Sequence, residues 1–357
     1  MCIVLVTTAH PKYALIVLDN RDEYILRPTS RPHWWTPNQE PSSSVTNGAH
    51  HRTATQEILS SRDLQRPEHG TWLGITKAGH FAVLTNYRET DTHDATHPVS
   101  GTRSRGGMVT AWLGADPSES TAEFIERMLQ HGDVKGVGGF SLLCGKLRRR
   151  KTADGRDTLE PLAILSNRSD SADEVPWLCG QRDEVHGLSN THFSDPKPWP
   201  KVENGVKLVR EAIKRAVEDD LDEDRLTDAL FGILDSDTLP IDESRSFEAY
   251  IPILKESIFI PAIGGQKNRQ DMLRALEDRK ETELDEAKQE LRDEERPDQT
   301  AQGFDTGMYG TQRQTVLLVD WDGNVTYKER ALWDSHGVAI PRGEGDMSFK
   351  FKIEGWT

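Results

Sequence analysis

The sequence predicts an α+β protein, and two patterns support that prediction. Short runs rich in valine, isoleucine and leucine recur along most of the 357-residue chain, and amphipathic helical segments interrupt them. Turn-forming residues follow several of these runs closely enough for antiparallel pairing. We therefore expect largely antiparallel sheets covered by helices, within a single domain over residues 1–357.

The chain begins with two strand-like segments, 3–8 and 13–19, joined by a His-Pro turn. A short turn makes the numbers of paired residues sum to about 21, which places Cys2 opposite Asp19. The polar residues Asn20-Arg21-Asp22-Glu23 are then expected to form a turn at the open end of this hairpin. The amino-terminal thiol and this charged quartet should therefore lie close together.

The remaining elements follow from the same two periodicities. Apolar runs of strand length predict strands, and apolar residues recurring every three or four positions predict helices. Polar, Gly-rich or Arg-rich stretches at 41–69 and 147–161 predict loops. The expected strands are 72–75, 81–86, 140–144, 162–166, 257–260, 315–320 and 325–330, and the expected helices are 120–130, 202–219 and 225–234.

A charged insertion is expected at residues 262–306. Within it, residues 271–296 carry 11 acidic and 6 basic side chains around a thin stripe of leucines. That pattern is typical of a solvated helix or a disordered arm. A protein partner that binds at 271–296 is a further hypothesis.

Bulk composition excludes several classes of function. A formal net charge of −15 opposes binding to nucleic-acid phosphates, so no nucleic-acid partner is expected. Three cysteines without paired spacing indicate free thiols in a reducing compartment, and the apolar runs fall short of the roughly 18 to 20 residues that span a bilayer. We expect a cytoplasmic protein with no transmembrane insertion, no secretory signal, no metal site and no required cofactor.

Cys2 is the most informative residue for chemistry. Removal of Met1 in front of a small side chain leaves a thiol and a free α-amine on one residue, which is a nucleophile with its own base. A nearby guanidinium favours the thiolate. The alternative is a small buried core cysteine.

The quartet Asn20-Arg21-Asp22-Glu23 directly follows an apolar strand, and three buried charges are costly unless they pair or meet a ligand. Asp22 is expected to orient an amine, and Arg21 to hold an anionic ligand group by a forked pair of hydrogen bonds. Asn20 is expected to donate to a developing oxyanion. The alternative is a salt-bridged turn without a ligand.

Met1-Cys2-Ile3, the apolar hairpin and the Asn-Arg-Asp-Glu quartet together resemble the NRDE family, also called transport and Golgi organisation 2. Blocks covering nearly the whole chain resemble that family in order. They are Gly70-Thr71-Trp72-Leu73-Gly74-Ile75, Leu84-Thr85-Asn86-Tyr87, Ser104-Arg105-Gly106, Gly139-Phe140, Gly187-Leu188-Ser189-Asn190, Pro198-Trp199, Tyr309-Gly310-Thr311 and Glu329-Arg330.

This resemblance implies the four-layer αββα sandwich of N-terminal-nucleophile hydrolases. If the chain is an enzyme, the shared layout implies Cys2, Asp22, Asn86 and Asn190 as its catalytic residues. Those hydrolases carry an arginine three positions before the aspartate, where this chain has Asp19.

Three functions are compatible with the family. The first is handling of an amphipathic ligand such as haem or acyl-CoA, with mitochondrial or Golgi association open. The second is a cysteine amidohydrolase that cleaves an amide or thioester. The third is a trafficking scaffold acting through the acidic arm at 271–296. The expected ligand-binding residues are Asn20, Arg21, Asp22, Glu23, Trp72, Tyr87, Ser189, Asn190 and Arg313, and we expect ligand handling in preference to catalysis.

Overall fold

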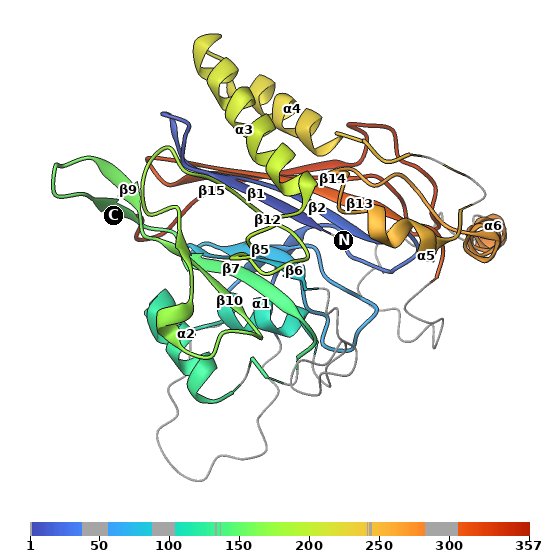
Figure 1. The fold of residues 1–357 in the computed structure, drawn as a ribbon, viewed down its shortest axis with the longest axis horizontal. Helices are drawn as coiled ribbons and strands as arrows, with labels where there is room; N and C mark the ends of the chain where they lie inside the picture. The colour runs from blue at the N-terminus through green and yellow to red at the C-terminus, as the bar shows by residue number, and fades with distance from the viewer. Residues whose placement is uncertain are drawn as a thin grey trace.

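The fold is described from a computed structural model of the chain. The described residues are 2–37, 56–87, 104–132, 134–135, 137–240, 242, 245–282 and 306–357. Within them, two antiparallel sheets stack face to face, and helices cover both outer faces (Figure 1). This is the predicted α+β class in four αββα layers.

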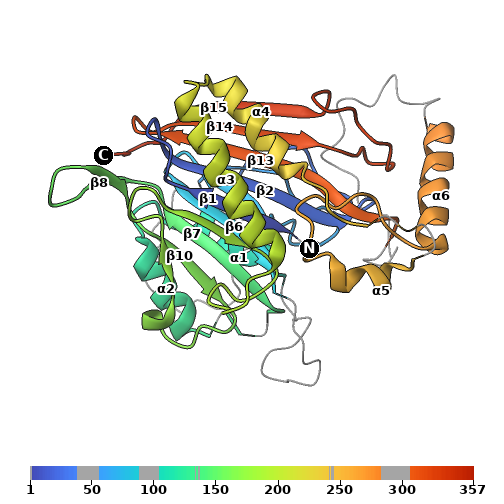
Figure 2. The ribbon, with the colours of Figure 1, turned by 45° about the horizontal axis from the view of Figure 1, so that its top comes forward.

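The first sheet contains both the chain's first strands and its last strands. Its order is β12 (Val185–Leu188), β1 (Ile3–Thr7), β2 (Tyr13–Tyr24), β13 (Tyr309–Asp320), β14 (Asn324–Ala331) and β15 (Asp346–Lys352). Helices α3 (Pro200–Glu218) and α4 (Glu223–Leu234) lie across its outer face (Figure 2). The central pair, β2 and β13, therefore joins segments from opposite ends of the sequence.

The second sheet is built from the middle of the chain. Its order is β11 (Trp177–Leu178), β10 (Leu162–Ser166), β7 (Phe140–Lys146), β6 (His80–Asn86), β5 (Leu73–Thr76), β4 (Ile58–Ser60) and β3 (His33–Trp35). Helices α1 (Gly106–Leu113) and α2 (Thr121–Gln130) cover its outer face. The remaining elements are a separate hairpin of β8 (Arg149–Lys151) and β9 (Asp157–Leu159), and α5 (Phe247–Tyr250), α6 (Gln266–Thr282), η1 (Ala172–Glu174) and η2 (Ile251–Ile253).

Strand alternation separates the core into layers. Along β1 and β2, Val4 and Val17 point into the space between the sheets, whereas Ile3 and Leu18 pack beneath α3 and α4. Successive side chains of a strand point to opposite faces, so the same alternation continues into the polar residues that follow.

Helix α3 lies very close to the first sheet because glycine stands at the contact. A Cβ atom added to Gly205 would lie 2.8 Å from Cδ2 of Leu5, and one added to Gly187 would lie 2.8 Å from Cγ1 of Val202. Pro200 is compatible with the first turn, where a backbone N–H has no helical partner. This close packing fixes the start of α3 beside the first residues of β1.

The quartet does not form a turn, and that prediction is wrong. Strand β2 continues through Tyr24, because β13 pairs with it from Tyr309↔Tyr24 to Asp320↔Tyr13. The hairpin register is Ile3↔Asn20, two residues away from the prediction, and it brings Cys2 level with Arg21 instead of Asp19. A central strand with two neighbours keeps its ladder through polar residues when those side chains find partners.

Other boundaries also differ from the sequence predictions. Residues 257–260 form no strand, and the expected loop at 147–161 contains the β8–β9 hairpin. The expected loop at 41–69 contains β4, while its residues 41–55 lie outside the described residues.

The charged arm is described only in part. Helix α6 begins it, and residues 283–305 lie outside the described residues. The single-domain organisation, the insertion boundaries at 262–306 and the partner site at 271–296 therefore stay predictions. In the described part of the chain, no helix combines the length and apolarity that crossing a bilayer requires.

Candidate functional site

Strand alternation sends the quartet to two different faces of β2. Asp19 and Arg21 point between the sheets, and the guanidinium of Arg21 lies 4.6 Å from the ring centroid of Trp72. Asn20 points to the helical side, where its Nδ2 donates to the carbonyl oxygens of Leu234 at 2.8 Å and Ile258 at 2.9 Å. Asn20 therefore anchors the end of α4 instead of facing a ligand.

Asp22 is a buried carboxylate at the Cys2 end of the first sheet. The hydroxyl of Thr311 donates to its Oδ1 at 2.7 Å, and the hydroxyl of Tyr309 donates to its backbone oxygen at 3.0 Å. Burial raises the pKa of the Asp22 carboxyl, while nearby positive charge, including Lys201, opposes that rise. Burial and the surrounding positive charge thus act in opposite directions on the pKa of this carboxyl.

Lys201 is the site residue that sequence reasoning missed. It lies in the first turn of α3 with no exposed surface, and its backbone N–H donates to Lys255 O at 3.0 Å. Desolvation lowers the pKa of the ammonium, and the negative charge of Asp22 opposes this, as does Cys2 in its thiolate form. Lys201 lies four residues before Gly205 on the buried face of α3, a pattern that sequence periodicity reveals.

The Cys2 thiol is enclosed beside Asp22. Its Sγ donates to the backbone oxygen of Asp22 at 3.9 Å, and only 4% of the residue is exposed. Burial raises the pKa of the thiol to about 11, so the sulfur rests protonated at neutral pH. A nucleophilic role for this thiol requires a base that removes its proton when a substrate is bound.

Hydrogen bonds connect the Cys2 strand to the second sheet. Ser189 Oγ donates to Cys2 O at 2.7 Å, and Thr85 Oγ1 donates to Ser189 O at 2.7 Å. Asn190 Nδ2 donates to Asn86 O at 2.5 Å. Both predicted asparagines therefore lie at the Cys2 end of the sandwich.

The two asparagines differ in what their side chains are free to do. The side chain of Asn190 is engaged, because it bonds to Asn86 O and its Oδ1 accepts from Ser189 Oγ at 3.3 Å. The half-buried side-chain amide of Asn86 has no hydrogen bond within the described residues. Nearby, Tyr87 carries the guanidinium of Arg168 at 4.8 Å from its ring. Asn86 is therefore the better placed of the two to donate to a bound molecule.

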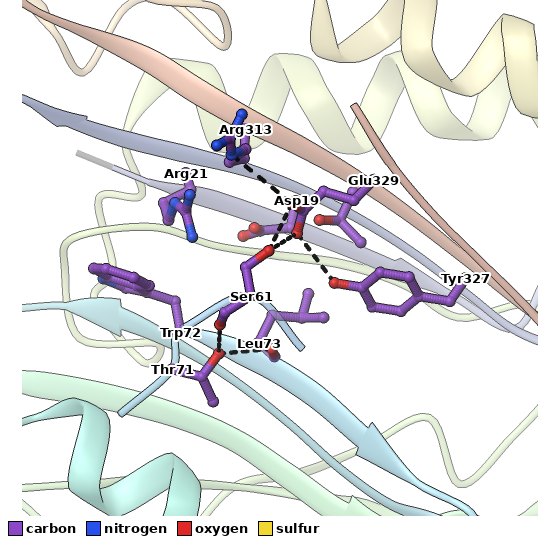
Figure 3. Close-up of a pocket in the computed structure, with 10 residues that line it drawn as sticks. Asp19, Arg21, Ser61, Thr71, Trp72, Leu73, Arg313, Tyr327 and Glu329 are labelled. Atoms are coloured by element: carbon purple, nitrogen blue, oxygen red, sulfur yellow. Dashed lines mark hydrogen bonds and ion pairs between the residues drawn. The ribbon is translucent and has the colours of Figure 1, made fainter. Parts of the chain in front are cut away.

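A second cluster of charges lies between the two sheets (Figure 3). Ser61 Oγ donates to the Glu329 carboxylate at 2.6 Å, Tyr327 OH donates to it at 3.2 Å, and Arg313 Nε lies 3.8 Å from it. Desolvation lowers the pKa of Arg313 to about 10, with Glu329 opposing. Burial raises the pKa of Asp19 to about 8, with Arg21 opposing.

This inter-sheet cluster encloses little space. The cavity between its side chains measures about 10 Å³, close to the least that holds one water molecule. Arg21 Nη2 donates to Gln312 Oε1 at 3.0 Å and to Thr29 Oγ1 at 3.3 Å. Three predicted ligand-binding residues therefore lie in this cluster and contact other residues of the protein. Arg21 stacks on Trp72, and Arg313 lies beside Glu329.

Glu23 also binds within the protein. Its Oε2 pairs with Arg27 Nη1 at 3.2 Å, and Arg27 makes two further bonds to Asp63 at 3.2 and 2.7 Å.

In the described part of the chain, no group of three or more His, Cys, Asp or Glu side chains is arranged to hold a metal ion. The residues that converge on Cys2 are therefore Asp22, Asn86, Ser189, Asn190 and Lys201.

The solved structures similar to this chain include a bile acid hydrolase and an acylase. A conjugated bile acid hydrolase from Clostridium perfringens is 10% identical with a TM-score of 0.36, over 99% of this chain and 97% of that one. A penicillin V acylase from Agrobacterium tumefaciens is 12% identical with a TM-score of 0.32, over 93% of this chain and 83% of that one.

Comparison of sequences gives relatives that cover nearly the whole chain. Transport and Golgi organization protein 2 homologs are 27% identical in Bos taurus and 28% identical in Homo sapiens, each over 90% of this chain and 88% of the relative. An uncharacterized protein of Saccharomyces cerevisiae is 25% identical over 99% of this chain and 100% of its own length. The profile of Transport and Golgi organisation 2 matches residues 1–334, and the chain belongs to that family.

Proposed function

We propose that this protein is an acyl-transfer hydrolase in which Cys2 is the nucleophile and an amide or thioester is the bond cleaved. One observation supports the proposal most strongly. A thiol, a carboxylate and an ammonium, from Cys2, Asp22 and Lys201, are buried together at one end of the sandwich and interact electrostatically. Buried titratable groups with shifted pKa values are typical of catalytic sites.

The chemistry begins with removal of Met1, which leaves the α-amine on Cys2. This amine takes the thiol proton, and the sulfur attacks the carbonyl carbon of the substrate. The bond to the leaving amine or thiol breaks as the proton passes to that group, and an acyl thioester forms on Cys2. Water then attacks the thioester, releases the acid and returns the proton to sulfur.

Neighbouring residues assist these steps. The Asp22 carboxylate, fixed by Thr311, orients the α-amine, and the Asn86 amide donates to the oxyanion that forms at the carbonyl. Asn190 holds the backbone of Asn86 through its 2.5 Å bond. The raised thiol pKa makes the base essential, because the sulfur does not ionise by itself at neutral pH.

The test uses mass spectrometry and a chromogenic amide, N-decanoyl-p-nitroanilide, together with decanoyl thioesters. We expect a decanoyl adduct on Cys2 and steady release of decanoate, both lost in Cys2→Ala. Cys144→Ala is the matched control, because Cys144 is also buried and lies in β7. Full activity of protein that retains Met1, or unchanged release by Cys2→Ala, would refute the proposal.

A second candidate is non-covalent handling of an amphipathic molecule such as haem or acyl-CoA. The observation that favours it is a cavity of about 230 Å³ whose lining includes apolar Ile263 and Met308, Tyr250, and the charged residues Asp242 and Arg269. Apolar walls with a few polar groups are typical of small-molecule sites.

Thermal unfolding tests this candidate with hemin and decanoyl-CoA as probes. A ligand at about one hundred times its Kd stabilises the native state by about 2.7 kcal/mol, which raises the melting temperature. Ala262→Phe places a larger side chain in the cavity lining and should remove the increase, whereas Cys2→Ala should keep it. An unchanged melting temperature with both probes would exclude this function.

A further inference from the structure

Arg105 stands immediately before α1, close to the candidate site, and its guanidinium is not used in the fold. It is half-buried and interacts electrostatically with Glu23, Arg66, Arg27 and Cys2. Within the described residues, no hydrogen bond or ion pair reaches this guanidinium. A partly buried arginine normally pairs, so a missing partner needs an explanation.

The nearby carboxylates are already engaged by another arginine. Arg27 Nη1 pairs with Glu23 Oε2 at 3.2 Å, and Arg27 Nε and Nη2 donate to the Asp63 carboxylate at 3.2 and 2.7 Å. Desolvation lowers the pKa of Arg105, and the positive charges of Arg66 and Arg27 lower it further, with Glu23 opposing. Among the described groups that act on Arg105, two are arginines, and Glu23 is already paired with Arg27.

The start of α1 is also held rigidly. A Cβ atom added to Gly70 would lie 2.8 Å from the carbonyl carbon of Gly106, so the two backbones touch directly. Arg105 thus extends from a backbone that is fixed at the very next residue, and such preorganisation strengthens recognition.

We propose that Arg105 binds an anionic group, a carboxylate or a phosphate, of the acyl substrate whose carbonyl Cys2 attacks. This inference rests on the proposed function and narrows its substrate class to amides or thioesters that carry a negative charge. A guanidinium matches both anions, because its planar N–H groups bind two oxygens in parallel. The role that the sequence assigns to Arg21 passes to Arg105, since Arg21 is bound by Gln312 and Thr29.

The experiment measures binding by calorimetry in a Cys2→Ala background, where the proposed turnover is blocked. The probes are decanoyl-glycine, which carries a carboxylate, decanoyl-CoA, which carries phosphates, and decanoyl-glycinamide, which is neutral. Arg105→Gln should weaken binding of at least one anionic probe by about tenfold to a hundredfold and leave the neutral probe unchanged. Arg105→Lys should retain part of the affinity.

Arg148→Gln is the matched control. Arg148 is a half-buried arginine beside β8 whose guanidinium donates to Leu147 O at 2.7 Å and to Ala78 O at 2.9 Å. The Arg148→Gln variant should bind every probe with the same affinity as the parent protein. Melting temperatures of all variants identify any general loss of folding.

The outcomes separate this inference from the proposed function. Equal losses for the charged and neutral probes, no loss in Arg105→Gln, or no binding of any probe to the parent overturns the role of Arg105. Turnover of the probes is measured separately with Cys2 present. Charge-dependent binding without any turnover supports Arg105 and rejects hydrolysis, whereas turnover that ignores charge and Arg105 rejects the anion site alone.

Discussion

Thr311 donates its hydroxyl to the Asp22 carboxylate at 2.7 Å, across 289 positions of sequence. The same hydroxyl accepts the Ile260 N–H at 2.9 Å. One side chain of β13 therefore fixes the central carboxylate of the site and also the segment that follows α5.

Thr311→Val should cost about 1 to 3 kcal/mol of unfolding free energy, because it leaves a buried carboxylate and a backbone N–H without their shared partner. The hydrogen bond lowers the pKa of Asp22, so its loss should raise that pKa further. Urea denaturation measures the first effect. Thr311→Ser keeps the hydroxyl and should lie close to the parent; equal losses in the two variants would contradict the prediction.

Lys201→Met should raise the pKa of Asp22, because the ammonium is one of the positive charges that lower it. Leaving a buried charge uncompensated costs up to about 3 to 5 kcal/mol, so the variant should also be less stable than the parent. A double-mutant cycle with Asp22→Asn measures the coupling, and the second substitution should recover part of the loss. Strict additivity of the two substitutions would show that the residues do not interact.

Asp19 should make stability fall as pH rises. Its pKa of about 8 in the fold exceeds the ordinary value of 3.8, so the folded state binds this proton more tightly than the unfolded chain does. The resulting stability is complete below about pH 4 and is lost as pH approaches 8.

Asp19→Asn removes the titrating proton and should flatten this fall, as measured by denaturation midpoints at pH 5 and pH 8. Asp220→Asn is the control, because Asp220 is exposed and pairs with Lys12 at the surface. If the parent protein and Asp19→Asn lose stability equally between these two pH values, Asp19 is not the titrating group.

Gly205→Ala should destabilise the protein by about 1 kcal/mol or more, because the added methyl would lie 2.8 Å from Leu5 Cδ2 in a filled core. Gly232→Ala in α4 is the matched control, since a Cβ atom there would meet no described atom within 4 Å beyond its own helix. That change should stabilise the helix by up to about 1 kcal/mol. Thermal melts of both variants test the pair, and destabilisation of similar size in both would argue against close packing at Gly205.

The sequence predicts the central elements of the fold because their patterns are local. The apolar runs that became β1 and β2, and the periodicity of α2, α3 and α4, depend on neighbouring residues only. The end of β2 does not. Residues 20–23 are typical of a turn. Asn20 still pairs with β1, but the continuation of the strand through Glu23 depends on pairing with β13, almost 300 positions away.

The same limit applies to the site. Convergence of Cys2 with Asp22 follows from the hairpin. The predicted register is in error by two residues, and a shift of two leaves each side chain of the quartet on the same face of the sheet. The sequence nevertheless predicts a ligand for Arg21, because it does not show that Gln312 reaches this side chain. Lys201 was accessible to sequence reasoning as a charge on the buried face of α3.

The pairing of β2 with β13 also determines when the molecule can be completed. Until residues 309–320 are present, the edge of β2 that faces β13 has unpaired backbone N–H and C=O groups. An exposed edge of this kind can pair with other chains. Contacts of this sequence separation form slowly, because a long loop must close first. A nascent or prematurely terminated chain therefore exposes an aggregation-prone strand until its carboxy-terminal hairpin arrives.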